Sequence, residues 1–378
     1  MKIAFLTPEY PHPKLGPAGG IGTGIMNLCA GLLALGHQPV VIIYGQPADT
    51  FFEEGGIRFH TLKNVRFKGL SWLLTRKKIQ KLINKLHAGG EIDIVEAPDW
   101  TGISAFVKSR CPMVIRLNGS DTYFCHLDGR PVNWFNKFLE KRALENADAL
   151  VSVSAFTAEV TNRVFKLRRH FEIIPNSIEV SRFAPVNVQP SEQTVLYFGT
   201  LIRKKGLLEL PHIFNRVIER NPQATLILAG RDAADIATKN PSTWSLMKPL
   251  FTPQALEATK YIGPLDYASV SALISRASVC VFPTFAEALP LSWLEAMAMQ
   301  KAVVACNIGW ATEIVEDGIS GLLAHPRDHG LFAGQISKLL EDEALRETMG
   351  IRARQRVLER FGNAIVARQT VEFYSKLI

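Results

Sequence analysis

Short apolar runs alternate with amphipathic segments along most of the chain. In the first half, the apolar runs predict strands near Lys2–Pro8, Pro39–Tyr44, Asp93–Ala97, Met113–Leu117, Ala149–Ser154 and Glu172–Ile174. Segments with a helical spacing of apolar residues lie between them, near Ile21–Leu35, Ser71–His87, Thr101–Ser109, Asn133–Glu145 and Ala155–Phe165. Because continuous apolar strands alternate with helices, we expect a parallel sheet covered on both faces.

The same pattern starts again after a break. Residues 183–192 are rich in proline and polar residues and lack any period, which predicts a linker. Beyond it we expect strands near Val195–Phe198, Thr225–Ala229, Val279–Pro283 and Val303–Cys306, and helices near Gly206–Glu219, Ala268–Ser275, Leu291–Gln300, Arg346–Arg360 and Ala364–Leu377. The predicted fold class is therefore α/β, with two Rossmann-like, doubly wound parallel-sheet domains, 1–185 and 186–361, facing a central cleft. The pattern leaves open whether the last helix, within 362–378, completes the first domain.

Two glutamates eight positions apart flank a predicted strand-to-helix junction in the second domain. Pro290 suits the first turn of the helix, because its missing N–H needs no partner there. Glu295 follows Leu291 by four residues, so it lies on the buried face of the helix. Glu287 lies in the loop at the carboxyl end of the strand, where open α/β sheets bind ligands. Either the two carboxylates are structural and paired with nearby groups, or they belong to a ligand site.

Composition indicates a globular protein of the reducing cytoplasm. Of its 378 residues, 47% are hydrophobic and 21% charged, which suits two domains with sizeable cores. No apolar run approaches the ~18 residues that a membrane-spanning helix needs. The apolar run at residues 3–6 is too short for a signal peptide, and we interpret it as a strand. Five cysteines without a C-x-x-C pair predict reduced, packed thiols and a cytoplasmic location.

The net charge of +8 is concentrated in the first half of the chain. Residues 1–185 hold 23 Lys and Arg against 16 Asp and Glu, a net charge of +7, and the remainder holds 20 against 19. Much of the excess lies in the runs 76–81, 137–142 and 163–169. Aromatic residues are not interleaved with these runs as a stacking surface would require, so no nucleic acid is predicted as a partner. The runs are either solvated helix faces or a peripheral contact with an anionic membrane at its inner face.

A glycine-rich segment follows the first predicted strand and opens a helix. Gly19, Gly20 and Gly22 permit close backbone approach, and the first N–H groups of a helix can bind an anion. The segment does not match G-x-G-x-x-G, and no acidic residue ends the next strand to bind a ribose. These departures argue against a nicotinamide cofactor.

Three consecutive cations, Arg203, Lys204 and Lys205, stand between a predicted strand and a helix in the second domain. Such charges repel one another and oppose the helix dipole, so they do not favour stability. A polyanionic ligand would reconcile them, and phosphate binding is the better interpretation. The segment is not a Walker A motif, which requires G-x-x-x-x-G-K-[ST].

Other strand ends present small or polar residues. In the second domain, Gly230, Arg231 and Leu265 would line a slot for a nucleobase, although ordinary turns explain them equally well. In the first domain, Asn118 follows a strand and would face the cleft opposite the two glutamates. No H-E-x-x-H or Asp-x-Asp motif occurs, so no metal is predicted.

Taken in order, these segments resemble the retaining GT-B glycosyltransferases of the E-x7-E family (glycosyl transferases group 1), which includes sucrose synthase, mannosyltransferases and lipopolysaccharide glucosyltransferases. Glu287 and Glu295 are similar to the E-x7-E signature, and residues 19–22 to the family's N-terminal entry. Residues 175–178 resemble P-N-G-[IV]-D, and residues 318–321 resemble D-G-x-x-G. The matches run from residue 3 to about residue 325, so the resemblance covers nearly the whole chain.

The resemblance implies that the second domain binds a nucleotide sugar without a metal or other cofactor, and that the first domain binds the acceptor. Arg203 and Lys205 would stabilise the diphosphate as the glycosidic bond breaks. Glu295 would bind the ribose and Glu287 the sugar, with Asn118 as the catalytic residue of the first domain. Further donor-binding groups implied are Gly19, Gly20, Gly22, Lys204, Gly230, Arg231, Leu265 and the amides of Leu289, Leu291 and Ser292.

The expected function is transfer of a hexose, with retention, from a UDP-sugar in preference to GDP-mannose. The expected acceptor is a hydroxyl group of a glycan or a lipid-linked molecule in cell-surface polysaccharide synthesis. Asn118 departs from the family pattern, which has His there, and an amide cannot become positively charged. Thr200 replaces an arginine, and residues 300–301 replace Gly-[KRV]-P. Two alternatives stay open: a catalytically weakened nucleotide-sugar-binding protein, and a nucleotide-sugar epimerase on the same fold.

Overall fold

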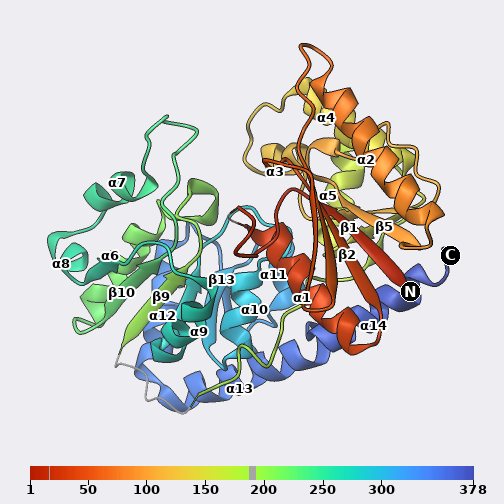
Figure 1. Ribbon diagram of the computed structural model, residues 1–378. Helices are drawn as coiled ribbons and strands as arrows, with labels where there is room; N and C mark the ends of the chain where they lie inside the picture. The colour runs from red at the N-terminus through yellow and green to blue at the C-terminus, as the bar shows by residue number, and fades with distance from the viewer. Residues whose placement is uncertain (17, 187–192) are drawn as a thin grey trace. The chain divides into compact units, whose positions relative to one another are not determined.

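The computed structural model describes residues 1–16, 18–186 and 193–378, which form two compact units (Figure 1). The first unit consists of Met1–Glu179 together with Phe361–Ile378, and the second of Val180–Arg360. The chain leaves the first unit at 179/180, whereas the sequence pattern placed this boundary at 185/186. Residues 187–192 of the expected linker lie outside the described residues.

The first unit is built on an eight-stranded sheet with the order β3-β4-β2-β1-β5-β6-β7-β8. Its strands are β1 (Lys2–Thr7), β2 (Gln38–Tyr44), β3 (Thr50–Glu54), β4 (Ile57–Leu62), β5 (Ile94–Pro98), β6 (Met113–Leu117), β7 (Ala149–Ser152) and β8 (Glu172–Ile173). β3 pairs antiparallel with β4, and the other neighbours pair parallel. The central strands β1, β5 and β6 are buried along nearly their whole length, as continuous apolar runs predict.

Helices cover both faces of this sheet. They are α1 (Gly20–Ala34), α2 (Ser71–Ala88), α3 (Asp121–Leu127), α4 (Trp134–Asn146), α5 (Ala155–Phe165) and α14 (Asn363–Tyr374). α1 and α14 pack on one another and share a core with β1 and β2, whereas α2 belongs to a separate core. Gly31 of α1 is required for this contact, since a Cβ there would lie 2.4 Å from the carbonyl oxygen of Asn363. The last helix therefore completes the first unit.

The second unit contains a parallel six-stranded sheet with the order β11-β10-β9-β12-β13-β14. Its strands are β9 (Thr194–Phe198), β10 (Thr225–Ala229), β11 (Thr259–Tyr261), β12 (Val279–Phe282), β13 (Ala302–Cys306) and β14 (Leu322–Ala324). Its helices are α6 (Leu210–Arg220), α7 (Thr243–Met247), α8 (Pro253–Glu257), α9 (Tyr267–Arg276), α10 (Leu291–Ala298), α11 (Ala311–Ile314), α12 (His329–Glu341) and α13 (Glu343–Arg360). The chain proceeds outward from β9 to β11 and then crosses to β12 on the other side of β9. Ligands of open α/β sheets bind at such a reversal of strand order.

Two of the expected helices differ in the structure. The segment Thr101–Ser109 contains only a short 3-10 turn, Trp100–Gly102, because Thr101 and Gly102 both adopt left-handed φ values, 53° and 56°. The helix expected from Gly206 begins at Leu210, since Gly206 has a φ of 74°. The sequence pattern also missed the hairpin of β3 and β4, because β3 is mostly exposed and lacks an apolar run. No helix among the described residues is long and apolar enough to cross a bilayer.

Candidate functional site

The loops that follow β9 and β12 meet where the strand order of the second sheet reverses. The carbonyl oxygen of Lys204 accepts hydrogen bonds from the N–H groups of Phe285, at 2.8 Å, and Ala286, at 3.3 Å. Gly206 lies so close to the neighbouring loop that a Cβ would be 1.7 Å from the carbonyl oxygen of Pro283. Only glycine fits at this contact. Backbone groups thus fix the two loops to each other.

Lys205 and Glu287 form an ion pair across this junction, with Nζ and Oε1 3.0 Å apart. Burial opposes the charge of Lys205, but the Glu287 carboxylate, supported by Tyr197 and Glu295, outweighs it and raises the pKa of the ammonium. Burial likewise opposes the charge of Glu287, but Lys205 and Lys204 hold the pKa of its carboxyl group below the usual value. Both side chains are therefore charged at neutral pH.

Glu295 lies on the inner face of α10 with 6% of its surface exposed, as its helical spacing predicts. The hydroxyl group of Tyr267 donates a hydrogen bond to its Oε1 at 2.9 Å. Burial raises the pKa of Glu295 to about 7, and the hydrogen bond from Tyr267 with the charges of Lys205 and Arg182 opposes this shift only in part. When ionised, this carboxylate can accept hydrogen bonds from a pair of hydroxyl groups.

The start of α10 brings together the other residues expected near the glutamates. The helix begins at Leu291, and its N-cap residue, Pro290, makes no side-chain hydrogen bond to the first N–H groups. Leu289 is buried just before this helix, and Leu291 and Ser292 are partly exposed in its first turn. The N-terminus of a helix favours an anion as its partner.

Arg203 is held in a two-point ion pair with Asp235, a residue that the sequence did not single out. Nε lies 2.7 Å from Oδ1, and Nη2 lies 2.8 Å from Oδ2. The hydrogen bond from Arg203 and those from Thr238 outweigh the burial of Asp235 and hold the pKa of its carboxyl group well below the usual range. Arg203 is therefore fixed in position while 45% of its side chain stays exposed. A phosphate at this position would share the guanidinium group with Asp235.

The segment after β10 is also a close backbone contact. Gly230 has a φ of 141°, and a Cβ there would lie 1.9 Å from the carbonyl oxygen of Gly199. Tyr261 donates a hydrogen bond from its hydroxyl group to the carbonyl oxygen of Gly230 at 2.9 Å. Arg231 and Leu265 are exposed near these strand ends. Their placement is compatible with a nucleobase slot and equally with ordinary turns.

The glycine-rich segment lies in the first unit, where the start of α1 already has an anionic partner. The N–H of Gly22 donates to Oε1 of Glu9 at 3.1 Å, and a Cβ on Gly19 would lie 3.1 Å from the same oxygen. Gly20 is the first residue of α1 and is exposed. In this structure the carboxylate of Glu9 therefore occupies the position that we expected for an external anion.

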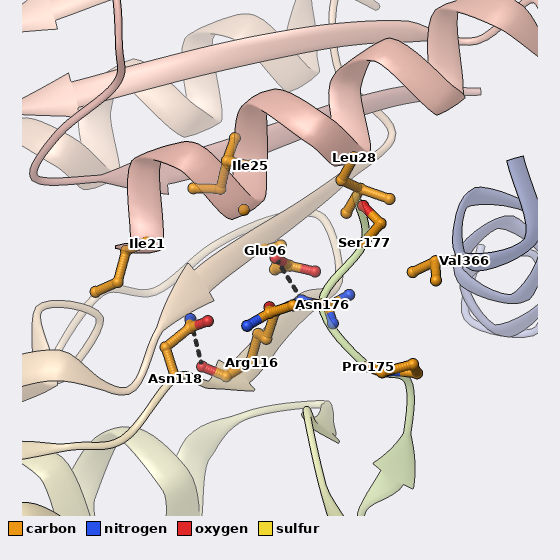
Figure 2. Close-up of a pocket in the computed structure, with 11 residues that line it drawn as sticks. Ile21, Ile25, Leu28, Glu96, Arg116, Asn118, Pro175, Asn176, Ser177 and Val366 are labelled. Atoms are coloured by element: carbon orange, nitrogen blue, oxygen red, sulfur yellow. Dashed lines mark hydrogen bonds and ion pairs between the residues drawn. The ribbon is translucent and has the colours of Figure 1, made fainter. Parts of the chain in front are cut away.

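Asn118 lies at the end of β6 in the first unit, where its backbone N–H donates to Oδ1 of Asp99 at 2.9 Å. Burial raises the pKa of Asp99 to about 7, against the effect of that hydrogen bond. Figure 2 shows Asn118 beside a pocket that Ile21 of α1 and Arg116 of β6 also line. The pocket measures about 20 Å³, enough for one water molecule.

A buried ion pair, Arg116 with Glu96, forms part of the lining of this pocket. Nε of Arg116 is 3.0 Å from Oε1 of Glu96 (Figure 2). Nη1 of Arg116 donates to the carbonyl oxygen of Ile174 at 2.9 Å. The hydroxyl group of Tyr374, in the last helix, donates to the other oxygen of Glu96. The pair therefore links β5, β6 and α14 within the first unit.

The structure brings Lys205 into contact with Glu287 and places Glu295 close enough to influence the pKa of Lys205. Sequence reasoning missed Asp235 and Tyr267, because both lie in segments without a recognised motif. Their contacts depend on loop conformation, which no periodic pattern encodes. Within residues 1–16, 18–186 and 193–378, no three His, Cys, Asp or Glu side chains gather as metal ligands would.

Two family models match the chain, at residues 181–356 (Glycosyl transferases group 1) and at residues 18–182 (Glycosyltransferase Family 4). Glycogen synthase of Mycobacterium tuberculosis is 26% identical over 408 aligned residues, which cover 99% of this chain and 94% of that protein. Sucrose-phosphate synthase of Thermosynechococcus elongatus superimposes with a TM-score of 0.81 at 22% identity, over 100% of this chain and 99% of the other. HepE of Anabaena in complex with UDP-glucose gives a TM-score of 0.75 at 20% identity, over 100% of both chains. Both structures share the two-domain fold of this chain.

Proposed function

Because this chain belongs to the group 1 glycosyltransferases with the GT-B fold, we propose that it transfers a hexose from a UDP-sugar to a hydroxyl group of a glycan or lipid-linked acceptor. The observation that supports the donor site most directly is the Lys205–Glu287 pair at the reversal of strand order. It provides a permanently charged cation beside a carboxylate, next to the uncapped start of α10. A diphosphate can bind to the ammonium group of Lys205 and to the start of α10, and a sugar hydroxyl group can donate to the carboxylate of Glu287.

The proposed chemistry is electrostatic. As the bond between the sugar and the diphosphate breaks, negative charge grows on the leaving oxygen, and Lys205 with Arg203 stabilises it without reorganising. The ion pair with Asp235 keeps Arg203 in one orientation, so less freedom is lost when a phosphate binds. Glu287 accepts hydrogen bonds from the sugar, and Glu295 accepts them from the ribose. The acceptor hydroxyl group attacks from the face of the leaving group and gives its proton to the departing diphosphate oxygen, so the configuration at the sugar is retained.

UDP is the proposed nucleotide because HepE, which shares this fold, was crystallised with UDP-glucose. We further propose that no metal is needed, since the cations of the site itself, Arg203 and Lys205, would neutralise the diphosphate. The proposed role is synthesis of a cell-surface polysaccharide such as lipopolysaccharide. The proposed location is the cytoplasm, with peripheral contact at the inner face of the membrane.

A donor panel with the full chain tests this proposal. Thermal unfolding is measured with UDP-glucose, UDP-galactose, GDP-mannose and ADP-glucose, and a ligand at about 100 times its Kd should stabilise the protein by ~2.7 kcal/mol. Release of UDP and the anomeric configuration of the product are then followed by NMR, with and without EDTA. Stabilisation by a UDP-sugar and turnover that EDTA does not change are expected. Stabilisation by GDP-mannose alone would refute the proposed donor, and loss of turnover in EDTA would refute metal independence.

A further inference from the structure

Four large apolar side chains are exposed at one edge of the first unit, where α2 and α4 begin. They are Phe67 and Leu70, just before α2, and Trp134 and Phe138, in the first turns of α4, with exposures of 57%, 45%, 77% and 47%. Trp134 and Phe138 are four residues apart, so they project from the same face of α4. We refer to these four side chains as the aromatic edge.

The aromatic edge stands on a packed base of further rings. Trp72 of α2 contacts Phe135 of α4, with ring centroids 5.3 Å apart, and Phe106 contacts Phe138 at 6.2 Å. Trp134 also contacts Phe135 at 5.6 Å. The starts of α2 and α4 are therefore held side by side in the first unit (Figure 1). The exposed rings are part of an ordered surface, and a hydrophobic surface of this kind marks an interaction site.

The charge around the aromatic edge is strongly positive. Residues 63–90 contain eight Lys and Arg and not one Asp or Glu. On α4, Lys137, Lys141 and Arg142 follow the exposed rings. The helix also carries two glutamates: Glu140 is buried, where it accepts hydrogen bonds at the start of α3, and the exposed Glu145 lies 3.8 Å from Lys141 and 4.0 Å from Arg142. Not every cation is available, because Arg76 is buried among backbone carbonyl groups and Lys78 is paired with Asp49, its Nζ 2.6 Å from Oδ1. The remaining excess favours an anionic partner.

Exposed Trp and Phe side chains amid Lys and Arg are typical of surfaces that bind at the headgroup level of a bilayer. A folded acidic protein would match the charge alone, whereas a bilayer also provides an apolar layer just beneath its phosphates. We propose that the aromatic edge docks the first unit on an anionic lipid bilayer, with Trp134 and Phe138 inserted below the headgroups. The inference deepens the proposed function, because it rests on the proposal that the acceptor is lipid-linked and names the surface that meets the membrane.

Vesicle flotation with the full chain tests the docking surface without any sugar donor. We expect the protein to float with vesicles of phosphatidylcholine and phosphatidylglycerol in equal parts, and to stay unbound with phosphatidylcholine alone. Each basic residue near an anionic surface contributes about a fivefold gain in partitioning, so added salt should weaken binding strongly. Absence of flotation with the anionic vesicles, or equal flotation with both compositions, would overturn the inference.

Paired variants locate the contact. Trp134→Ala/Phe138→Ala should reduce flotation by tenfold or more, since burial of two aromatic rings is lost. Phe51→Ala removes a comparably exposed phenyl ring from β3, with 56% exposure, and should leave flotation unchanged. Lys137→Gln/Lys141→Gln should also weaken flotation, whereas Arg168→Gln, in another basic run of the same unit, should not. If the control variants Phe51→Ala and Arg168→Gln weaken flotation as much as the variants of α4 do, binding does not depend on the aromatic edge, and the inference is refuted.

Tryptophan fluorescence gives a second measurement. Anionic vesicles should shift the emission to shorter wavelength in the wild type, and Trp134→Phe should abolish most of the shift while it retains flotation. A change of molecular mass in solution that depends on Trp134 would instead indicate self-association and refute the membrane inference. UDP release with a water-soluble acceptor is measured in parallel without vesicles. Loss of flotation with intact transfer separates failure of the docking surface from failure of the proposed function.

Discussion

In the first unit the Arg116–Glu96 pair joins two neighbouring strands, and in the second unit the Lys205–Glu287 pair joins the loops after two neighbouring strands; the two pairs differ mainly in solvent access. In the first unit, Arg116 and Glu96 are 3.0 Å apart, with 6% and 4% of their side chains exposed. In the second unit, Lys205 and Glu287 are also 3.0 Å apart, but 21% and 15% of their side chains are exposed. The contact distance is the same, so it cannot tell a structural pair from a ligand site.

The surroundings of the two pairs explain the difference. In the first unit, Tyr374 of α14 donates to the second oxygen of Glu96 and the carbonyl group of Ile174 accepts from Arg116, and only Nη2 of Arg116 is left without a partner among the described residues, beside a pocket that holds about one water molecule. The pair in the second unit lies in loops at the reversal of strand order, beside a helix start without a side-chain cap. A buried pair mainly avoids the penalty of an isolated charge, whereas a partly exposed pair leaves its cation accessible to an anion. We therefore propose that the first pair contributes to stability and that the second binds a ligand.

The strongest test of this assignment removes one partner of the closed pair. Arg116→Met should lower the free energy of unfolding of the first unit by about 3–5 kcal/mol, because Glu96 is left as an uncompensated buried charge. Urea unfolding followed by circular dichroism measures the loss. Arg116→Met/Glu96→Leu should recover much of it, since no charge is then buried. In the second unit, Lys205→Met should cost less than Arg116→Met, because Glu287 has more access to water than Glu96. Equal losses at both sites would break the comparison.

Removal of the cation from the open pair should affect turnover instead. Lys205→Ala should reduce the rate of sugar transfer by about 10²–10³-fold, because the charge that grows on the diphosphate loses its main partner. Donor binding by the same variant, measured by calorimetry, should weaken as well. Lys260→Ala, an exposed cation on β11 of the same unit, serves as the control and should keep normal turnover. Undiminished turnover in Lys205→Ala would remove the second unit's pair from the donor site.

The titration of Glu295 gives a smaller, pH-dependent effect. With a pKa of about 7, roughly one tenth of this group is ionised at pH 6 and nine tenths at pH 8, so affinity for UDP-glucose should rise about tenfold over that range. UDP-glucose is the suitable ligand, because its esterified diphosphate does not titrate there. Without ligand, a rise in pH has the opposite effect, because ionisation of Glu295 lowers the stability of the folded protein. The folded-state pKa exceeds the unfolded value, so the contribution of Glu295 to stability falls as pH rises from about 4 to 7.

Two variants decide whether Glu295 is responsible. Glu295→Gln should make the affinity for UDP-glucose independent of pH between 6 and 8. Tyr267→Phe removes a hydrogen bond that favours the ionised carboxylate, so the midpoint of the pH dependence should move upward. A pH dependence that survives in Glu295→Gln would have to come from another group and would contradict the assignment.

The sequence predicts the local features of this molecule better than the contacts between distant residues. The fold class and the family resemblance are confirmed, because continuous apolar runs and ordered motifs are local features of the chain. The inward position of Glu295 also followed from helical spacing alone. The partners of the charged residues were not predictable in this way. Asp235 is 32 residues from Arg203, and the intervening loop conformation brings them together.

Corrections to the predicted elements have a similar origin. Thr101–Ser109 has helical spacing of apolar residues but is not a helix, because Gly102 packs against the backbone of Leu139 in α4 and takes a left-handed conformation. Such tertiary contacts override local preference. The glycines at the start of α1 suggested an external anion, whereas Glu9, from the preceding segment, provides the carboxylate in this structure. A carboxylate eleven residues before Gly20 had no motif that would reveal it.

The smallest effect is expected at Asn118, which follows β6 in the first unit. Its backbone N–H donates a hydrogen bond to Asp99, which fixes the backbone from which the side chain extends. Asn118→His restores the residue usual in the family, and an amide and a neutral imidazole can each donate one hydrogen bond to a sugar hydroxyl group. One such bond corresponds to about 0.5–1.5 kcal/mol, so turnover should change by less than about tenfold, without loss of thermal stability.

A pH–rate profile of both proteins completes the test. An increase of more than about a hundredfold, confined to pH values where the new histidine is protonated, would mean that this position must carry positive charge. The first unit would then contribute a catalytic charge of its own. Electrostatic catalysis would no longer be confined to the second unit, which contains the Lys205–Glu287 pair.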